Sequence, residues 1–101
     1  MRRGEVYGYE SVLSRPWQST KRLIISADEV NDFSELGIVL TLHVQDEDPG
    51  GLLSVRVGEH GWASVLTIGE SLRRRMGERV GTATQDEMEH VGNALRAALD
   101  L

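Results

Sequence analysis

Residues 38–44 read Ile-Val-Leu-Thr-Leu-His-Val, and this run decides the fold class. Seven mostly apolar residues, rich in β-branched side chains, are typical of a strand and are too few for a core helix. Outward from this run, four more short segments have strand character and a weaker one follows them. We therefore expect further strands at residues 5–9, 23–25, 53–57, 62–68 and 79–82.

The segments between these strands have the composition of connections. Residues 10–21 are polar and predict a loop, and residues 28–35 form an acidic connector. Residues 48–51 read Asp-Pro-Gly-Gly, in which proline fixes φ and glycine permits a positive φ, so a turn is expected there. A second turn is expected at 58–61, and a short helical turn carrying three arginines at 69–77.

The last segment of the chain is the clearest helix. Thr84 and Glu87 have the spacing of a capping box, in which each side chain bonds the other residue's backbone N–H. An apolar stripe at helical spacing follows, formed by Met88, Val91, Leu95, Ala98 and Leu99. Short strands followed by one helix predict a mainly β domain with a C-terminal α-helix (α+β), arranged as a small antiparallel barrel or half-open sheet with the helix packed on it.

Composition limits the class of protein. The 101 residues suffice for one domain, taken as 1–101, and contain no cysteine, so disulfides and thiolate metal sites are excluded. No apolar run is long enough to span a membrane, and the basic start at 1–3 is not followed by the apolar stretch of a signal peptide, so we expect a cytoplasmic protein. The net charge of −5 argues mildly against indiscriminate nucleic-acid binding, although local basic clusters exist.

Four segments of the chain, at residues 3–7, 18–31, 75–81 and 85–101, resemble the MazF/PemK/Kid toxins of type II toxin–antitoxin systems. Residues 3–7 read Arg-Gly-Glu-Val-Tyr, which is similar to the "RGEVYW" start of that family, and residues 18–31 have the layout of its Q-x-x-x-R-P motif followed by an apolar strand. Residues 75–81 are similar to its R-L-G-E-K-I-G motif, and 85–101 resemble its terminal helix. The resemblance covers nearly the whole chain, strongly at both ends and weakly in the middle.

The resemblance implies an SH3-like antiparallel barrel that assembles as a homodimer. It also implies a sequence-selective, metal-independent endoribonuclease that cleaves single-stranded RNA through a 2′,3′-cyclic phosphate and arrests growth. An antitoxin with a disordered, acidic and apolar tail is expected to neutralise it. RNA cleavage of this kind needs a base for the 2′-OH proton, an acid for the leaving 5′-oxygen and a cation for the phosphorane.

The resemblance implies that Arg22 is the phosphate-binding cation, although Leu23 replaces the proline that usually follows it. The family's catalytic hydroxyl falls on Val44, which can neither donate nor accept a proton. His43 is the substitute nearest in sequence, and its ordinary pKa suits acid–base work. Strand alternation points it away from the face of residue 44 unless a bulge intervenes.

Candidate RNA contacts are more dispersed. Trp17 is a large aromatic residue in the predicted loop, where it can stack on a base or equally cover the core or a dimer contact. Thr67 falls at a polar position of the family pattern. The complete expected set of RNA-binding residues is Gln18, Lys21, Trp17, Thr67 and Arg73. The three histidines lack ligand spacing, so we expect no metal and no cofactor.

A second reading belongs to another functional class. The missing threonine favours a non-enzymatic protein of the same fold that acts by binding protein, either as a gyrase poison like CcdB or as an inactive regulatory subunit. The gyrase version requires a tryptophan near the end of the last helix, and this helix ends Ala-Leu-Asp-Leu at 98–101. Cleavage of RNA by the purified chain, with and without EDTA, separates the two readings.

Overall fold

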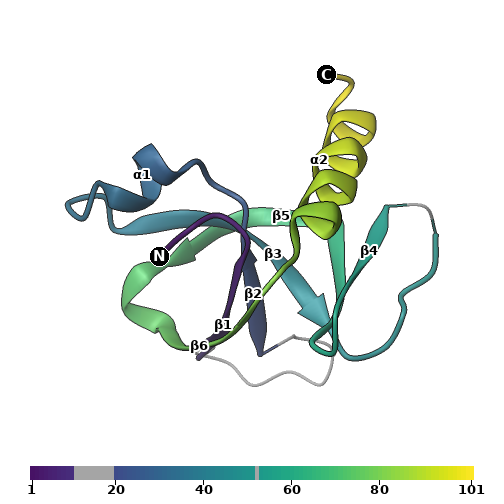
Figure 1. The fold of residues 1–101 in the computed structure, drawn as a ribbon. Helices are drawn as coiled ribbons and strands as arrows, with labels where there is room; N and C mark the ends of the chain where they lie inside the picture. The colour runs from purple at the N-terminus through teal and green to yellow at the C-terminus, as the bar shows by residue number, and fades with distance from the viewer. Residues whose placement is uncertain (11–19, 52) are drawn as a thin grey trace.

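The strand expected at 38–44 is β3 (Ile38–Gln45), which lies inside a six-stranded antiparallel sheet of order β4-β5-β3-β2-β1-β6 (Figure 1). The computed structural model describes residues 1–10, 20–51 and 53–101. Its other elements are β1 (Glu5–Tyr9), β2 (Lys21–Ile24), α1 (Asp28–Asp32), β4 (Ser54–Val57), β5 (Gly61–Leu72), the 3-10 turn Arg73–Arg75, β6 (Met76–Thr82) and α2 (Gln85–Leu99).

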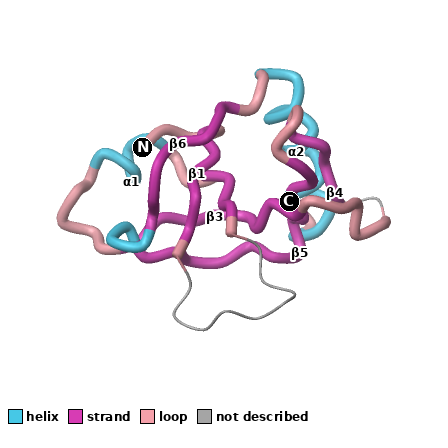
Figure 2. The backbone as a smooth tube through the Cα atoms, turned by 90° about the horizontal axis from the view of Figure 1, so that it is seen from below, coloured by secondary structure: helices cyan, strands magenta, loops and turns pink. Residues whose placement is uncertain are grey.

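The six expected strands are all present, but the sheet is open. Since β4 and β6 are its two edges among the described residues, the closed barrel expected from the resemblance is corrected to a curved, half-open sheet. Figure 2 shows the strands curving toward one another, with α1 and α2 at opposite ends. The curvature gives the sheet a face covered by α2 and a second face turned away from that helix.

Two connections differ from the sequence prediction. The acidic segment contains the five-residue helix α1, which is too short to display a helical period. The expected helical turn at 69–77 shrinks to Arg73–Arg75, because β5 continues to Leu72 and β6 begins at Met76. Pairing with β3 extends β5 through Gly-Glu-Ser at 69–71, residues with little strand preference of their own.

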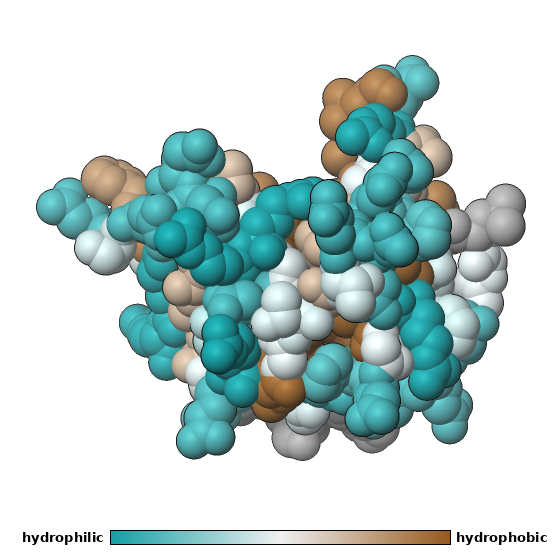
Figure 3. All heavy atoms as spheres, viewed as in Figure 1, coloured by the Kyte–Doolittle hydropathy of each residue, from teal (hydrophilic) through white to brown (hydrophobic). Residues whose placement is uncertain are grey.

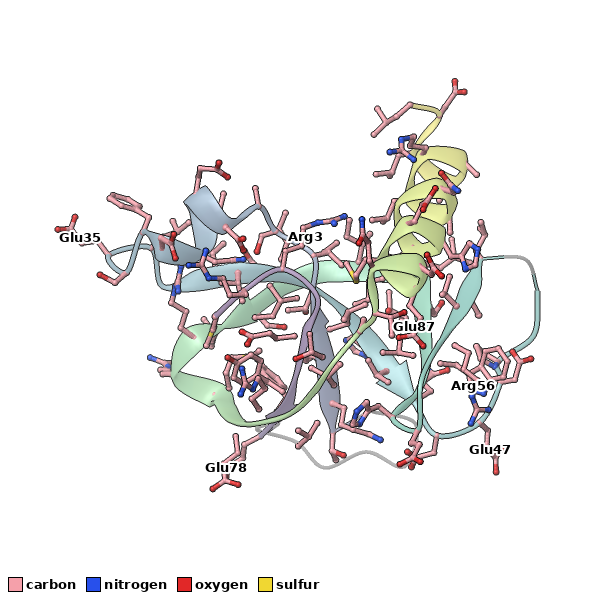
Figure 4. All side chains as sticks on the ribbon, viewed as in Figure 1. Arg3, Glu35, Glu47, Arg56, Glu78 and Glu87 are labelled. Carbon is pink, nitrogen blue, oxygen red and sulfur yellow. The ribbon has the colours of Figure 1, made fainter. Side chains whose placement is uncertain are left out.

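The capping box of α2 is confirmed. Thr84 Oγ1 accepts from the Glu87 N–H at 3.1 Å, and Glu87 Oε1 accepts from the Thr84 N–H at 2.8 Å. The second carboxylate oxygen of Glu87 accepts from the Gly58 N–H at 2.7 Å, so the start of the helix is fastened to the β4–β5 turn. Figure 4 shows Glu87 at the base of α2, beside these two strands.

The main core lies between α2 and the sheet. Register places Val6, Leu23 and Leu42 side by side on adjacent strands, and Val91 of the helix joins the same fully buried cluster. The last turn of α2 projects beyond this core, because Ala98 and Leu99 of the predicted stripe are exposed. No helix among the described residues is long and apolar enough to cross a membrane.

Gly61, at the first position of β5, provides a test of this packing. Its φ is +126°, and an added Cβ would lie 2.1 Å from the carbonyl oxygen of Gln45. Gly61→Ala should therefore lower the free energy of unfolding by at least about 2 kcal/mol, from backbone strain and the clash together. The measurement is urea unfolding. The matched control is Gly37→Ala, because that site has no atom within 4 Å of the new Cβ and no positive φ; an equal loss in both variants contradicts the argument.

Candidate functional site

A row of polar side chains crosses the sheet on the face opposite α2. Residues directly paired on neighbouring antiparallel strands point to the same side, with Cβ atoms about 5 Å apart. Register pairs Tyr7 of β1 with Arg22 of β2, pairs Arg22 with His43 of β3, and pairs His43 with Ser64 of β5. Arg79 of β6 is paired with Tyr7 and extends the row. The fold therefore brings the two predicted catalytic residues, Arg22 and His43, together.

Arg22 lies at the centre of this row, where two contacts hold its guanidinium. Its guanidinium carbon lies 4.4 Å from the centroid of the Tyr9 ring, a cation–π distance, and Nη1 donates to the Lys21 carbonyl at 3.0 Å. The residue is only 3% exposed. Burial lowers the pKa of Arg22 and the Tyr9 side chain opposes this shift, yet a guanidinium stays protonated in proteins. The row thus contains a fixed positive charge.

His43 is half-buried beside that charge. Two effects lower the pKa of His43 below its usual value. Burial is the larger one, and the Arg22 charge is the second. The imidazole is therefore neutral at pH 7, which is the form that accepts a proton. Val44, at the position of the family hydroxyl, points into the α2 core and is 1% exposed. The strand alternation expected for residues 43 and 44 is confirmed, and it directs His43 toward Arg22.

Glu5 anchors the β1–β6 end of the row. Its carboxylate accepts from Tyr7 Oη at 3.0 Å and from the Arg2 N–H at 2.6 Å, and it pairs with Arg79 Nη1 at 2.7 Å. Burial raises the pKa of Glu5, but the bonds from Arg79, Arg2 and Tyr7 outweigh burial and lower it overall. This network fixes Tyr7 and Arg79 beside the central arginine.

Lys21 lies on the other face of the sheet. It is paired with Val44, and its Nζ donates to the His60 carbonyl and forms an ion pair with Asp46 at 3.2 Å. Lys21 therefore fastens β2 to the loops beside the α2 core. This geometry does not bring it to the polar row with its neighbour Arg22.

Arg73 is engaged by the end of α1. Its Nη1 donates to the Asn31 carbonyl at 2.8 Å, and its Nη2 donates to the carbonyls of Val30 at 2.8 Å and Phe33 at 3.2 Å, while Nε donates to Leu36. They add to the backbone N–H bonds that the Val30 and Phe33 carbonyls already accept, and they supply a donor to the Asn31 carbonyl at the end of the short helix. They give Arg73 a structural role and argue against contact with RNA.

Thr67 lies next to the row, but its hydroxyl bonds the backbone of β3 and β5. Gln18 and Trp17 lie outside the described residues. No group of three or more histidine, cysteine or acidic side chains that could hold a metal ion occurs in the described part of the chain.

The sequence prediction missed five members of the site: Glu5, Tyr7, Tyr9, Ser64 and Arg79. The first three had a signal, because alternation along β1 places them on one face of the strand. Ser64 had none, because its place opposite His43 depends on the register of β5, which sequence does not reveal.

Comparison with solved structures identifies the fold. An endoribonuclease from a mycobacterial species is 22% identical with a TM-score of 0.82, over 100% of this chain and 92% of that one. A mycobacterial endoribonuclease in complex with its cognate antitoxin is 21% identical with a TM-score of 0.83, over 100% and 96%. MazF from Deinococcus radiodurans is 17% identical with a TM-score of 0.78, over 100% and 97%.

The chain therefore shares the fold of these solved proteins, a curved antiparallel sheet with a terminal helix. That fold is the MazF fold, so the mainly β fold with a C-terminal helix expected from the sequence is confirmed, with an open sheet in place of the closed barrel. No protein-family model and no curated protein sequence matches the chain. The similarity to these solved proteins is therefore one of backbone fold, and the chemistry of the site depends on this chain's own residues.

The bonds of Arg73 predict a stability effect. Arg73→Ala removes four side-chain hydrogen bonds, including those to the Asn31 and Leu36 carbonyls, so the free energy of unfolding should fall by about 2 kcal/mol. The exposed neighbour Arg74 is the matched control, and Arg74→Ala should change stability by less than about 0.5 kcal/mol. Thermal unfolding measures both. Similar values for the two variants would show that the Arg73 bonds contribute nothing to stability.

Proposed function

We propose that this chain is a cytoplasmic, metal-independent endoribonuclease toxin that cleaves single-stranded RNA and arrests growth. The observation that carries the proposal is the direct pairing of Arg22 with His43 on one face of the sheet. The solved proteins of the same fold include two mycobacterial endoribonucleases and a MazF, which supports RNA cleavage as the reaction class.

The chemistry follows from the two side chains. Neutral His43 takes the proton of a ribose 2′-OH, and the resulting oxygen attacks the adjacent phosphorus. Arg22 stabilises the negative charge of the phosphorane through its planar, two-pronged donor geometry. The bond from phosphorus to the 5′-oxygen breaks, that oxygen takes a proton from water, and a 2′,3′-cyclic phosphate is left. Because DNA lacks the 2′-OH, it is not a substrate.

Substrate binding must also expose the cation. Arg22 is almost completely buried in the free chain, and a phosphate oxygen needs direct contact with its guanidinium nitrogens. We therefore expect side chains around Arg22 to rearrange when RNA binds. The next residue, Leu23, is fully buried and paired with strands on both sides, so the movement is expected from the surrounding side chains and not from the β2 backbone.

Cleavage of a long single-stranded RNA by the purified chain tests the function. Activity should be the same with and without EDTA. Arg22→Ala should lower the rate by on the order of 10²-fold or more, the scale of one transition-state charge donor, and His43→Ala by a similar factor. Arg74→Ala and His90→Ala, which alter exposed residues of the same types, should keep full activity.

Each other outcome has a clear reading. Full activity of Arg22→Ala rejects the site, and full activity of His43→Ala rejects that residue as the base. If the wild-type chain leaves RNA intact, the non-enzymatic alternative of a protein-binding member of this fold takes its place.

The pKa of His43 predicts the pH profile. A base must be neutral, and burial together with Arg22 holds the pKa of His43 below 6.5. The value of kcat/KM should therefore fall as pH falls through this lowered pKa, so the acid limb should lie below pH 6.5. The measurement is cleavage of a short RNA between about pH 4.5 and pH 8. An acid limb centred above pH 6.5 contradicts the assignment.

The surface supports a homodimer. Leu40 on β3 and Ile68 on β5 share the sheet face of α2 and are exposed, as are Leu99 and Leu101 at the end of that helix. Figure 3 shows hydrophobic side chains at the C-terminal end of α2. A second copy of the chain covering these residues would remove their apolar surface from water. A domain of this size buries only part of its apolar surface in its own core, so this added burial would be stabilising.

Light scattering tests the dimer. The wild-type chain at micromolar concentration should have about twice the mass of the 11.2-kDa chain. Leu40→Lys/Leu99→Lys should shift the mass to one chain, because two charges would be buried in the interface. Val80→Lys, on the edge strand β6, is the control and should stay dimeric. A monomeric wild type excludes the dimer.

We also propose an antitoxin partner. Solved structures of the same fold include complexes described as an endoribonuclease with its cognate antitoxin and as MazE–MazF. A surface that accepts RNA phosphates at Arg22 also accepts carboxylates, so an acidic and apolar tail on the polar row would compete with substrate. Rising salt should weaken the polar part of this binding.

A further inference from the structure

The pairing of β3 with β5 is interrupted at His43. Thr41 is paired with Gly69 and His43 with Ser64, so one residue of β3, Leu42, faces four residues of β5, 65–68. A bulge of this size interrupts the regular hydrogen-bond ladder and leaves local backbone groups without their usual partners. The interruption lies directly beside the proposed base.

The side chain of Thr67 closes this bulge. Its Oγ1 accepts from the His43 backbone N–H at 2.8 Å and donates to the Ser64 carbonyl at 2.6 Å. One hydroxyl therefore bonds both members of the His43–Ser64 pair and replaces a missing backbone contact. It needs both a donor and an acceptor function, which a methyl group cannot supply.

We propose that Thr67 is a positioning residue, whose hydroxyl fixes the backbone of His43 so that the imidazole faces Arg22. The inference rests on the proposed function in taking the imidazole as the reacting group. Both bonds of the Thr67 hydroxyl go to backbone groups, the His43 N–H and the Ser64 carbonyl, so Thr67 acts through the His43 main chain. Serine retains the two bonds, whereas valine has nearly the same shape and retains neither.

The electrostatic surroundings of His43 make its position measurable. Arg22 is the charged side chain paired with it from β2, and the residue paired with it from β5, Ser64, is uncharged. Burial and the arginine together lower the pKa of His43. If the bulge loosens, the imidazole gains water and moves relative to Arg22, so the pKa of His43 should rise toward its usual value.

The test compares Thr67→Val and Thr67→Ser by NMR titration of the His43 imidazole and by RNA cleavage. In Thr67→Val the pKa of His43 should rise and kcat should fall by up to about 10²-fold, the scale of a small misplacement of a reacting group, with KM little changed. Thr67→Ser should resemble the wild type in both measurements.

Thr41→Val is the matched control. Thr41 is a buried threonine on the other side of the bulge, and its hydroxyl bonds Ser71 Oγ at 2.7 Å. This variant should lose stability without shifting the pKa of His43 or lowering kcat. A wild-type pKa and kcat in Thr67→Val, or equal effects in Thr41→Val, overturn the proposal.

Two further outcomes are distinguished from a failure of the proposed role of Thr67: a variant that does not fold, and a wild type that does not cleave RNA. If Thr67→Val does not fold, hydrogen exchange of the wild-type protein decides, because the His43 amide should be strongly protected by its bond to Thr67 and rapid exchange would overturn the proposal. If the wild type does not cleave RNA, the proposed function fails, while the titration of His43 in the Thr67 variants still decides whether Thr67 positions the imidazole.

Discussion

The register of β1, β2 and β3 is the constraint on which the rest of the structure depends. Side chains alternate between the two faces of a strand, so a slip of one residue would exchange the faces completely. In the observed register Leu23 enters the core under α2 while Arg22 faces His43. The packing of apolar residues into the core therefore also places the charged row on the opposite face. No additional interaction is needed to set the register of the strands that form the site.

The polar row contains a buried cation, Arg22, so the groups around it determine how far its charge is stabilised. Placing a charge away from water is unfavourable unless nearby groups stabilise it. The Tyr9 ring and the Lys21 carbonyl contribute to this for Arg22, and the Glu5 carboxylate holds Tyr7 and Arg79 at the next strands. Both rings and the carboxylate come from β1, so one five-residue strand supplies most of the environment of the central arginine.

Sequence predicted what depends on local pattern. The capping box at Thr84, the β-branched run of β3 and the alternation that separates His43 from Val44 all required only neighbouring residues. Long-range contacts explain the differences. The carbonyls that engage Arg73 are about 40 positions earlier in the chain, the carbonyl that engages Lys21 belongs to His60, and the N–H that bonds Thr67 belongs to β3. Residue type alone does not tell a cation bound to carbonyls from one available to phosphate. The helix α1 and the open sheet edges likewise follow from tertiary pairing.

Glu87 joins parts of the chain that are nearly 30 residues apart. Burial raises the pKa of this carboxyl, but the N–H groups of Thr84 and Gly58 outweigh burial and lower it overall. Its contribution to stability is therefore present above the unfolded pKa and is lost as pH falls through the folded one. Protonation would weaken the bonds from the Thr84 and Gly58 N–H groups in the same step, so acid should loosen the first turn of α2 and the β4–β5 turn together.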